Sequence, residues 1–234
     1  MSLQEPNRNQ YSFVNLPDYK STTQFLERKI ITLIDNSSMV LDAGSGRWNR
    51  MLKSRKAKKI IGVDIEFDSI KSNKIINFGV VGDIQQQMFQ EEVFDLIVSN
   101  DLVEHLQYPE QFIKVCSRVL KPFGHIVIAA PNRNSLFGIL AAIIPNDVKQ
   151  WLFKIIFGRR NQNEVHFYRL NTEDAFRGIL TKNGFSHIDI TFINKLGSKP
   201  TGRIFWGWYY QLCRTIPFMR KASSGLLCIA QKIA

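Results

Sequence analysis

The sequence predicts an α/β fold built on a doubly wound, parallel β-sheet. Apolar runs alternate with stretches of helical periodicity over five repeats, which is the pattern of strand-helix units around a parallel sheet. Two of the runs, Val40–Asp42 and Ile60–Asp64, end at an acidic residue. A third, Phe94–Ser99, is almost continuously apolar, as a strand covered on both faces should be. Ligands of such sheets bind beyond the carboxyl ends of the strands.

The N-terminal part of the chain is predicted to hold an arm and a helix. Residues 1–18 are mostly polar, so we expect a loose arm there. Thr22 or Thr23 can cap a helix that runs to about Ile34, because apolar side chains recur there at helical spacing. The apolar runs that follow predict five strands, at about Met39–Asp42, Ile60–Asp64, Ile75–Val81, Phe94–Ser99 and His125–Ala130.

Two further helices should lie between these strands. One holds Met51 and Leu52 and ends in the basic cluster of residues 53–59, where cations complement the helix dipole. The other has an apolar inner face and should be stopped by Pro122 and Gly124 before the fifth strand begins.

The stretch Val40–Arg47 carries the strongest functional signal. Its apolar run is followed by Gly44 and Gly46, which predicts a buried strand that breaks into a tight turn before a helix. Glycines let a bound molecule approach the backbone, and free N–H groups at a helix start suit an acceptor group. Asp64 lies 18 residues after Gly46, near the spacing of an acid that binds a ribose.

One residue in this stretch and one just after it narrow the class of nucleotide that could bind. A dinucleotide-binding fingerprint needs a third glycine where this chain has Asn49. Asp42 lies just before the turn, where a carboxylate would repel a pyrophosphate but attract an ammonium group. A cationic nucleoside without phosphates therefore fits best.

Several motifs in order resemble those of class I S-adenosylmethionine-dependent methyltransferases. The similarity is close over residues 38–132 and looser over 166–193, and an ordered set of motifs is more specific than any single one. The family usually has a third glycine where this chain has Trp48. The motifs are Asp42-x-Gly44-x-Gly46, Gly62-Val63-Asp64-Ile65, Gly82-Asp83-Ile84, the run from Phe94 to Leu106 and the run from Arg118 to Ile128.

The resemblance implies the complete fold. It is a Rossmann-like, doubly wound, seven-stranded and mostly parallel sheet with an antiparallel last strand and helical insertions. A helix with Asn171 as its N-cap and Gly184 as its stop should precede strands at about His187–Ile193 and Leu226–Ile233. The chain should form one methyltransferase domain over 1–234, divided into an N-terminal arm and helix (1–37), a cofactor-binding core (38–133), an amphipathic insertion (134–165), a core helix and strand (166–194), an aromatic and basic insertion (195–223) and the last strand (224–234).

The resemblance also implies a binding site for S-adenosyl-L-methionine. Asp42 should act toward its ammonium group, and Asp64 should bind both ribose hydroxyls. Asp83 should accept from the adenine amine, with Ile65 and Ile84 on either side of the ring. The residues expected to bind the cofactor are Asp42, Ala43, Gly44, Ser45, Gly46, Asp64, Ile65, Asp83, Ile84, Asn100 and Asp101.

Two histidines are candidate catalytic residues. Placement of donor and acceptor carries much of the rate of methyl transfer, but a hydroxyl acceptor also needs a base with a near-neutral pKa. His105 follows the fourth strand, and His166 lies where the first insertion returns. The competing interpretation of His105 is that it only orients its loop. Glu104 beside it lacks a third ligand, so no metal site is predicted.

The two insertions combine apolar and basic residues in a way that is unusual for surface loops. Leu136–Ile144 is almost wholly apolar, and Trp206 and Trp208 lie among arginines. Interfacial membrane helices have this composition, although a lid or a dimer face would also explain it. Residues 132–166 loosely resemble the corresponding insertion of quinone-biosynthesis O-methyltransferases, which contact the bilayer.

Composition limits the cellular context. Lys and Arg number 31 against 20 Asp and Glu, and the resulting charge of +11 attracts anions such as nucleic acid, lipid head groups or phosphorylated substrates. Cys116, Cys213 and Cys228 have no zinc-binding spacing and suit a reducing compartment. No secretory signal and no membrane span are expected, so the prediction is a cytoplasmic protein, with contact at the membrane surface left open.

Three functions remain open on the sequence alone. The leading one is a methyltransferase acting on an oxygen of a small-molecule or lipid-linked acceptor. Trp48 favours a rival, a non-catalytic, membrane-associated module with the same fold. The positive charge favours an RNA methyltransferase, but Ser99-Asn100-Asp101-Leu102 differs from the Asn-Pro-Pro-Tyr type of motif used in base methylation, so nucleic acid is disfavoured as a partner.

Overall fold

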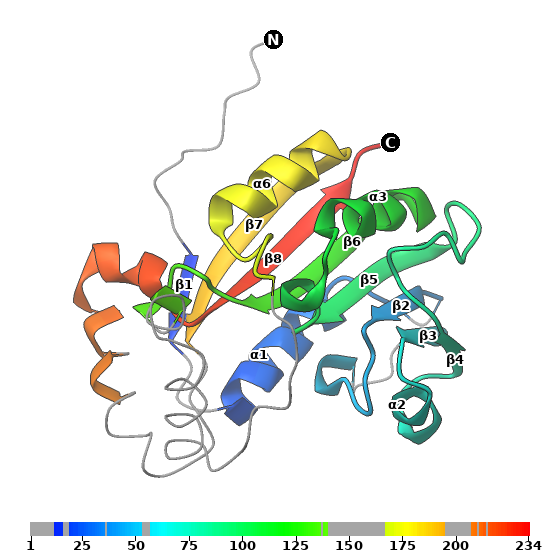
Figure 1. Cartoon of the computed structure of the whole chain (residues 1–234), viewed down its shortest axis with the longest axis horizontal. Coiled ribbons are helices and arrows are strands. Elements are labelled where there is room, and N and C mark those ends of the chain that lie inside the picture. The colour runs from blue at the N-terminus through cyan, green and yellow to red at the C-terminus, as the bar shows by residue number, and fades with distance from the viewer. Residues whose placement is uncertain are drawn as a thin grey trace.

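A single eight-stranded β-sheet forms the centre of the computed structural model (Figure 1). The structure describes residues 12–15, 19–35, 37–52, 57–136, 138–139, 167–194, 207–209, 211–213 and 215–234. The strands are β1 (Ser12–Asn15), β2 (Met39–Ala43), β3 (Lys59–Asp64), β4 (Phe78–Val81), β5 (Phe94–Asn100), β6 (Leu120–Pro131), β7 (Phe185–Asn194) and β8 (Gly225–Lys232). They lie in the order β1-β7-β8-β6-β5-β2-β3-β4. Every neighbouring pair is parallel except those that β8 forms with β6 and β7.

Seven of these strands confirm the predicted Rossmann-like sheet with an antiparallel last strand. The eighth, β1, corrects the expectation of a loose arm over residues 1–18. It pairs in parallel with β7, from Ser12 opposite Thr191 to Asn15 opposite Asn194. The physical reason is that β7 would otherwise present an edge of unpaired backbone groups. Four residues are too short a run for hydrophobic periodicity to reveal.

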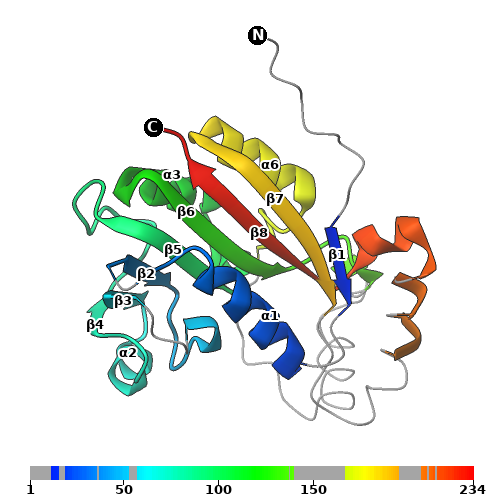
Figure 2. The ribbon, with the colours of Figure 1, turned by 180° about the vertical axis from the view of Figure 1, so that it is seen from behind.

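Helices cover both faces of the sheet (Figure 2). α3 (Pro109–Val119) and α6 (Glu173–Lys182) lie on one face, and α1 (Tyr19–Ile31) lies on the other. The fully buried Phe112 and Phe176 pack from the first side, and Leu26 and Ile30 pack from the second. None of the described helices combines the length and the apolar character needed to cross a membrane.

Three predicted helix boundaries were wrong. α1 begins at Tyr19, before either threonine. α6 is capped by Thr172, whose side chain accepts from the N–H of Ala175, while the side chain of the expected cap Asn171 donates to the carbonyl of Pro131. α3 ends at Val119 and β6 begins at once, so the proline and glycine expected to stop the helix lie within the strand.

The helix expected after the first strand is also largely absent from the described residues. In the described residues a short 3₁₀ turn, η1 (Arg50–Leu52), follows β2, and residues 53–56 of the basic cluster lie outside the described part of the chain. α1 packs over this turn, and Met51 and Leu52 join the same core as Leu26 and Ile30. A helix from the N-terminal part thus covers the sheet here.

Both insertions leave from the carboxyl edge of the sheet, and hydrogen bonds join their described ends. The first begins after β6, and the second runs from β7 to β8. The side-chain amide of Asn132 donates to the carbonyls of Lys221 and Ser223, at 2.8 Å each. The hydroxyl of Tyr209 accepts from the N–H of Leu136. It donates to the carbonyl of Ala222, the last residue of the 3₁₀ turn η3 (Pro217–Ala222) that precedes β8.

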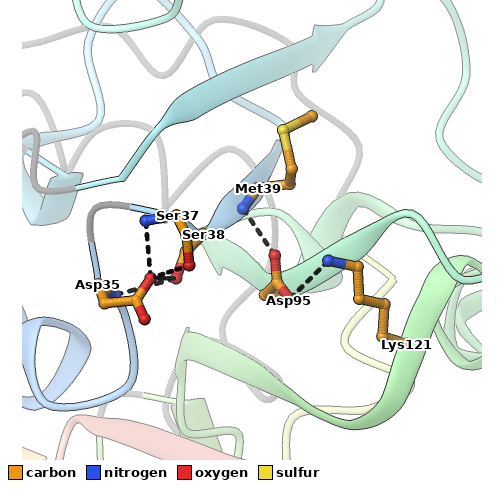
Figure 3. Close-up of polar contacts among 6 residues, drawn as sticks. All are labelled: Asp35, Ser37, Ser38, Met39, Asp95 and Lys121. Atoms are coloured by element: carbon orange, nitrogen blue, oxygen red, sulfur yellow. Dashed lines mark hydrogen bonds and ion pairs between the residues drawn. The ribbon is translucent and has the colours of Figure 1, made fainter.

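A polar network fixes the opposite end of the central strands (Figure 3). The carboxylate of Asp95, on β5, accepts from the N–H of Met39, the first residue of β2, at 2.7 Å. Its other oxygen accepts from the Lys121 ammonium group at 2.8 Å. The neighbouring Asp35 accepts from the backbone and hydroxyl of Ser37, which lowers the pKa of Asp35. These bonds hold the starts of β2 and β5 side by side.

We expect Asp95→Ala to lower the free energy of unfolding by about 1–3 kcal/mol, because it leaves the N–H of Met39 without its acceptor. Lys121→Met should cost less than about 1 kcal/mol, since that ion pair is partly exposed. Urea denaturation of both variants measures the difference. Equal losses would contradict the assignment and would place the stabilisation in the ion pair.

Candidate functional site

The glycine turn follows β2, and the side chain of Leu102 lies close to its backbone at Gly44. Gly44 and Gly46 have φ angles of 68° and 51°, in the left-handed region that disfavours other residues. A Cβ atom at Gly44 would lie 2.9 Å from Cδ1 of Leu102. Space and backbone conformation therefore both require glycine at this position.

The N–H groups of the turn are already used, which corrects the expectation of free donors at a helix start. Those of Gly44 and Ser45 donate to the carbonyl of Val63, at 2.9 and 3.0 Å. That of Gly46 donates to Asp64 at 2.9 Å. The turn thus offers little to a phosphate, which agrees with the inference of a phosphate-free ligand.

Asp42 is a buried carboxylate with one oxygen open. Its Oδ1 accepts from the side chain of Asn49 at 2.6 Å, and its Oδ2 is buried without a hydrogen-bond partner among the described residues. Burial raises the pKa of Asp42 to about 7, the charge of Asp64 adds to the rise, and the bond from Asn49 opposes it. Since a buried acceptor is costly to leave unsatisfied, this oxygen fits a cationic ligand group.

Asp64 lies at the end of β3 and is held by the backbone. Its two oxygens accept from the N–H groups of Gly46 and Glu66, at 2.9 Å each. A carboxylate has about four acceptor positions, so two remain for ligand hydroxyls. Ile65 beside it is 77% exposed and offers apolar surface at the same edge.

Asp83 and Ile84 follow β4. Asp83 accepts from the backbone and side chain of Gln85. Ile84 is only 4% exposed and belongs to the core on the α3 side of the sheet, so of the two isoleucines Ile65 presents the larger surface.

Strand register brings the predicted residues together. Ala43 pairs with Val63 on one side and with Ser99 on the other. The residues that follow these three, namely Gly44, Asp64 and Asn100, therefore lie at one level of the carboxyl edge. Asp101 comes next, with a left-handed φ of 52°, and accepts from the side chain of Asn100 at 3.2 Å.

Only one of the two candidate catalytic histidines can be placed. His105 ends the 3₁₀ turn η2 (Val103–His105), just beyond β5, and is half-buried. His166 lies outside the described residues. The geometry therefore leaves the base as a prediction.

Tyr168 is a residue of the site that the sequence did not reveal. Its N–H and that of Phe167 donate to the carbonyl of Glu104, at 3.3 and 2.7 Å. Burial raises the pKa of Tyr168, and the charges of Glu104 and Asp101 add to the rise, so its phenol stays protonated beside them. A tyrosine beyond a long insertion has no spacing that could have placed it here.

Comparisons with known proteins agree with this architecture. Residues 41–128 match the family described as "Methyltransferase domain". The ubiquinone biosynthesis O-methyltransferase of Idiomarina loihiensis is 25% identical over 138 residues, which cover 56% of each chain. The mitochondrial enzyme of the same name from Mus musculus is 37% identical over 68 residues, covering 26% of this chain and 18% of that one. The chain thus spans about half or less of these two relatives.

Solved structures support the fold. A SAM-dependent methyltransferase from Archaeoglobus fulgidus has a TM-score of 0.59 at 20% identity, and the match covers 92% of this chain and 96% of that one. A phosphoethanolamine N-methyltransferase 2 from Haemonchus contortus, solved with S-adenosyl-L-methionine, has a TM-score of 0.58 at 14% identity, covering 91% and 53%.

The buried carboxylate predicts a pH-dependent stability. The folded pKa of Asp42 is about 7 against an ordinary value of 3.8, so its contribution to stability is fully present below pH 3.8 and is lost as the pH rises to 7. Asp42→Asn keeps an oxygen that can accept from Asn49 and removes the charge. We expect its melting temperature to exceed that of the wild type by more at pH 8 than at pH 5.

Thermal unfolding at the two pH values measures this effect. The exposed Asp68→Asn serves as the matched control, and its difference from the wild type should not change between them. A pH-independent difference for Asp42→Asn would mean that the carboxyl group does not titrate in this range.

Proposed function

Since residues 41–128 form a class I S-adenosylmethionine-dependent methyltransferase domain, we propose that the chain transfers a methyl group from S-adenosylmethionine to an oxygen of a small-molecule or lipid-linked acceptor. The observation that carries the proposal is the buried Oδ2 of Asp42, left open at the carboxyl edge beside the glycine turn. S-adenosylmethionine carries an ammonium group that suits this oxygen, and it supplies an activated methyl group.

Each group of strand-end residues is proposed to bind a different part of this ligand. Ala43, Gly44, Ser45 and Gly46 let its methionine end approach the backbone. Asp64 has two acceptor positions left for the ribose hydroxyls, and Ile65 offers apolar surface to the adenine. The burial of Asp42 makes each of its polar contacts stronger than it would be in water.

The acceptor side is proposed to lie over the end of β5. Asn100 ends β5, His105 lies just beyond it, and the N–H of Tyr168 donates to the carbonyl of Glu104 beside His105. His105 and His166 are our candidates for the base that takes the acceptor proton. A tyrosine is a hydrogen-bond donor at neutral pH, and the raised pKa of Tyr168 keeps it one at higher pH as well. The choice of oxygen as the acceptor atom rests on the names of the matched relatives, which are ubiquinone biosynthesis O-methyltransferases.

Calorimetric titration tests the cofactor assignment. We expect the wild type to bind S-adenosylmethionine and S-adenosylhomocysteine with micromolar dissociation constants. Asp64→Ala should weaken both by roughly 10- to 100-fold, because it removes charge-assisted hydrogen bonds of about 1.5–3 kcal/mol. The exposed Asp68→Ala should bind like the wild type. If the wild type binds neither ligand, the non-catalytic module becomes the leading interpretation.

A second function, contact with an anionic membrane surface, is favoured by the described end of the second insertion. Residues 195–223 contain six Lys or Arg and no Asp or Glu. In the helical residues 207–209 and 211–213, Trp208 and Leu212 are 75% and 42% exposed, whereas Tyr209 and Cys213 are buried. Phe218 is 76% exposed, with Arg220 and Lys221 following it. An exposed apolar face with basic neighbours is typical of interfacial helices. Residues 140–165 of the first insertion lie outside the described residues.

Sedimentation with vesicles tests this contact. We expect the protein to bind phosphatidylcholine vesicles containing about 30% phosphatidylglycerol more strongly than neutral ones, because each basic residue near the surface contributes about 1 kcal/mol. Trp208→Ser combined with Phe218→Ser should reduce binding at least about fivefold. Phe78→Ser, at the far edge of the sheet and 55% exposed, is the control. A dimer that does not bind vesicles would instead assign the face to a second copy of the chain.

A further inference from the structure

Gln85 connects two parts of the site that are remote in the sequence. It follows β4 by a short turn, and it touches both Asp83 and the residue before α3. Its side-chain NH₂ group donates to both oxygens of Asp83, at 3.0 and 3.1 Å. Its backbone N–H also donates to Asp83, at 2.9 Å. The carbonyl oxygen of the same side chain accepts from the N–H of Tyr108 at 2.9 Å.

Counting acceptor positions shows what this arrangement leaves open. Oδ1 of Asp83 accepts two hydrogen bonds from Gln85, and Oδ2 accepts one. Each carboxylate oxygen has about two acceptor positions, so Oδ2 keeps one for an external donor. The side chain of Gln85 thus orients the carboxylate and limits it to one further N–H group.

The orientation is fixed from two sides. The amide of Gln85 cannot rotate about its last bond without breaking the bonds to Asp83 or the bond from Tyr108. Tyr108 is the N-cap residue of α3, and α3 packs in the core of the sheet, so the amide is held by a rigid element. Side chains fixed in this way hold a recognition group in one direction.

We propose that Gln85 is a positioning residue that makes Asp83 selective for a nucleobase with an exocyclic amine. The inference rests on the proposed function, since it takes the nucleobase to be that of S-adenosylmethionine. Adenine presents an N–H donor to the open position of Oδ2. Hypoxanthine presents a carbonyl oxygen at the same place, which a carboxylate repels. Gln85 does not contact the base in this proposal and acts through Asp83.

The test compares two ligands that differ in this one group. S-adenosylhomocysteine and S-inosylhomocysteine are titrated calorimetrically into the wild type, Gln85→Leu and Gln85→Glu. We expect the wild type to prefer the adenosyl ligand at least about tenfold, as loss of a hydrogen bond to a charged group implies. Gln85→Leu should reduce this ratio at least about threefold, because Asp83 keeps only its backbone bond. Gln85→Glu can still accept from Tyr108 but repels Asp83, and it should lose selectivity as well.

A matched control separates positioning from a general effect on folding. Gln87 is exposed, and its side chain makes no hydrogen bond with the described residues, so Gln87→Leu should keep the wild-type ratio. An unchanged ratio in both Gln85 variants would overturn the inference while leaving the proposed function intact. Failure of the wild type to bind S-adenosylhomocysteine would overturn the proposed function itself and, with it, this inference.

Discussion

The parallel pairing of β2 with β3 and β5 is the constraint on which the site depends. Because Ala43 is in register with both Val63 and Ser99, the residues after these positions reach the carboxyl edge at one level. A shift of one residue in either pair would turn the side chains to the opposite face. The bond between Asp95 and Met39, at the opposite end of β5 and β2, helps to hold the register of these two strands (Figure 3). Hydrogen bonds at the amino-terminal ends of β2 and β5 thus support the alignment of the residues at their carboxyl ends.

The Oδ2 of Asp42, unpaired among the described residues, destabilises the ligand-free protein, and a bound cationic group would remove that cost. An unpaired, buried carboxylate is a local cost that the rest of the core must offset. The bond from Asn49 satisfies one oxygen, and the N–H groups of the glycine turn donate to Val63 and Asp64 and not to the other oxygen. The arrangement leaves a cationic ligand group as a fitting partner for Oδ2. This kind of local disagreement between polar groups and burial is typical of functional sites.

The sequence predicted the strands that carry acids at their ends, because an apolar run and a terminal carboxylate are both local patterns. It did not predict β1, since a four-residue edge strand depends on a partner near the other end of the chain. The cap of α6 was misplaced by one residue because Asn171 and Thr172 are both good caps, and a tertiary bond to Pro131 decides between them. Gln85 and Tyr168 were missed for a similar reason, as their contacts join segments that no spacing relates.

The pairing of β1 with β7 also has a consequence for the order in which the strands join the sheet during folding. Residues 12–15 pair with residues 191–194, so the bonds that complete the sheet edge close a loop that contains most of the chain. Such a closure carries a high entropic cost until the intervening strands are in place. During synthesis residues 12–15 leave the ribosome long before residues 191–194, with which they pair. We therefore expect β1 to be among the last strands to join the sheet.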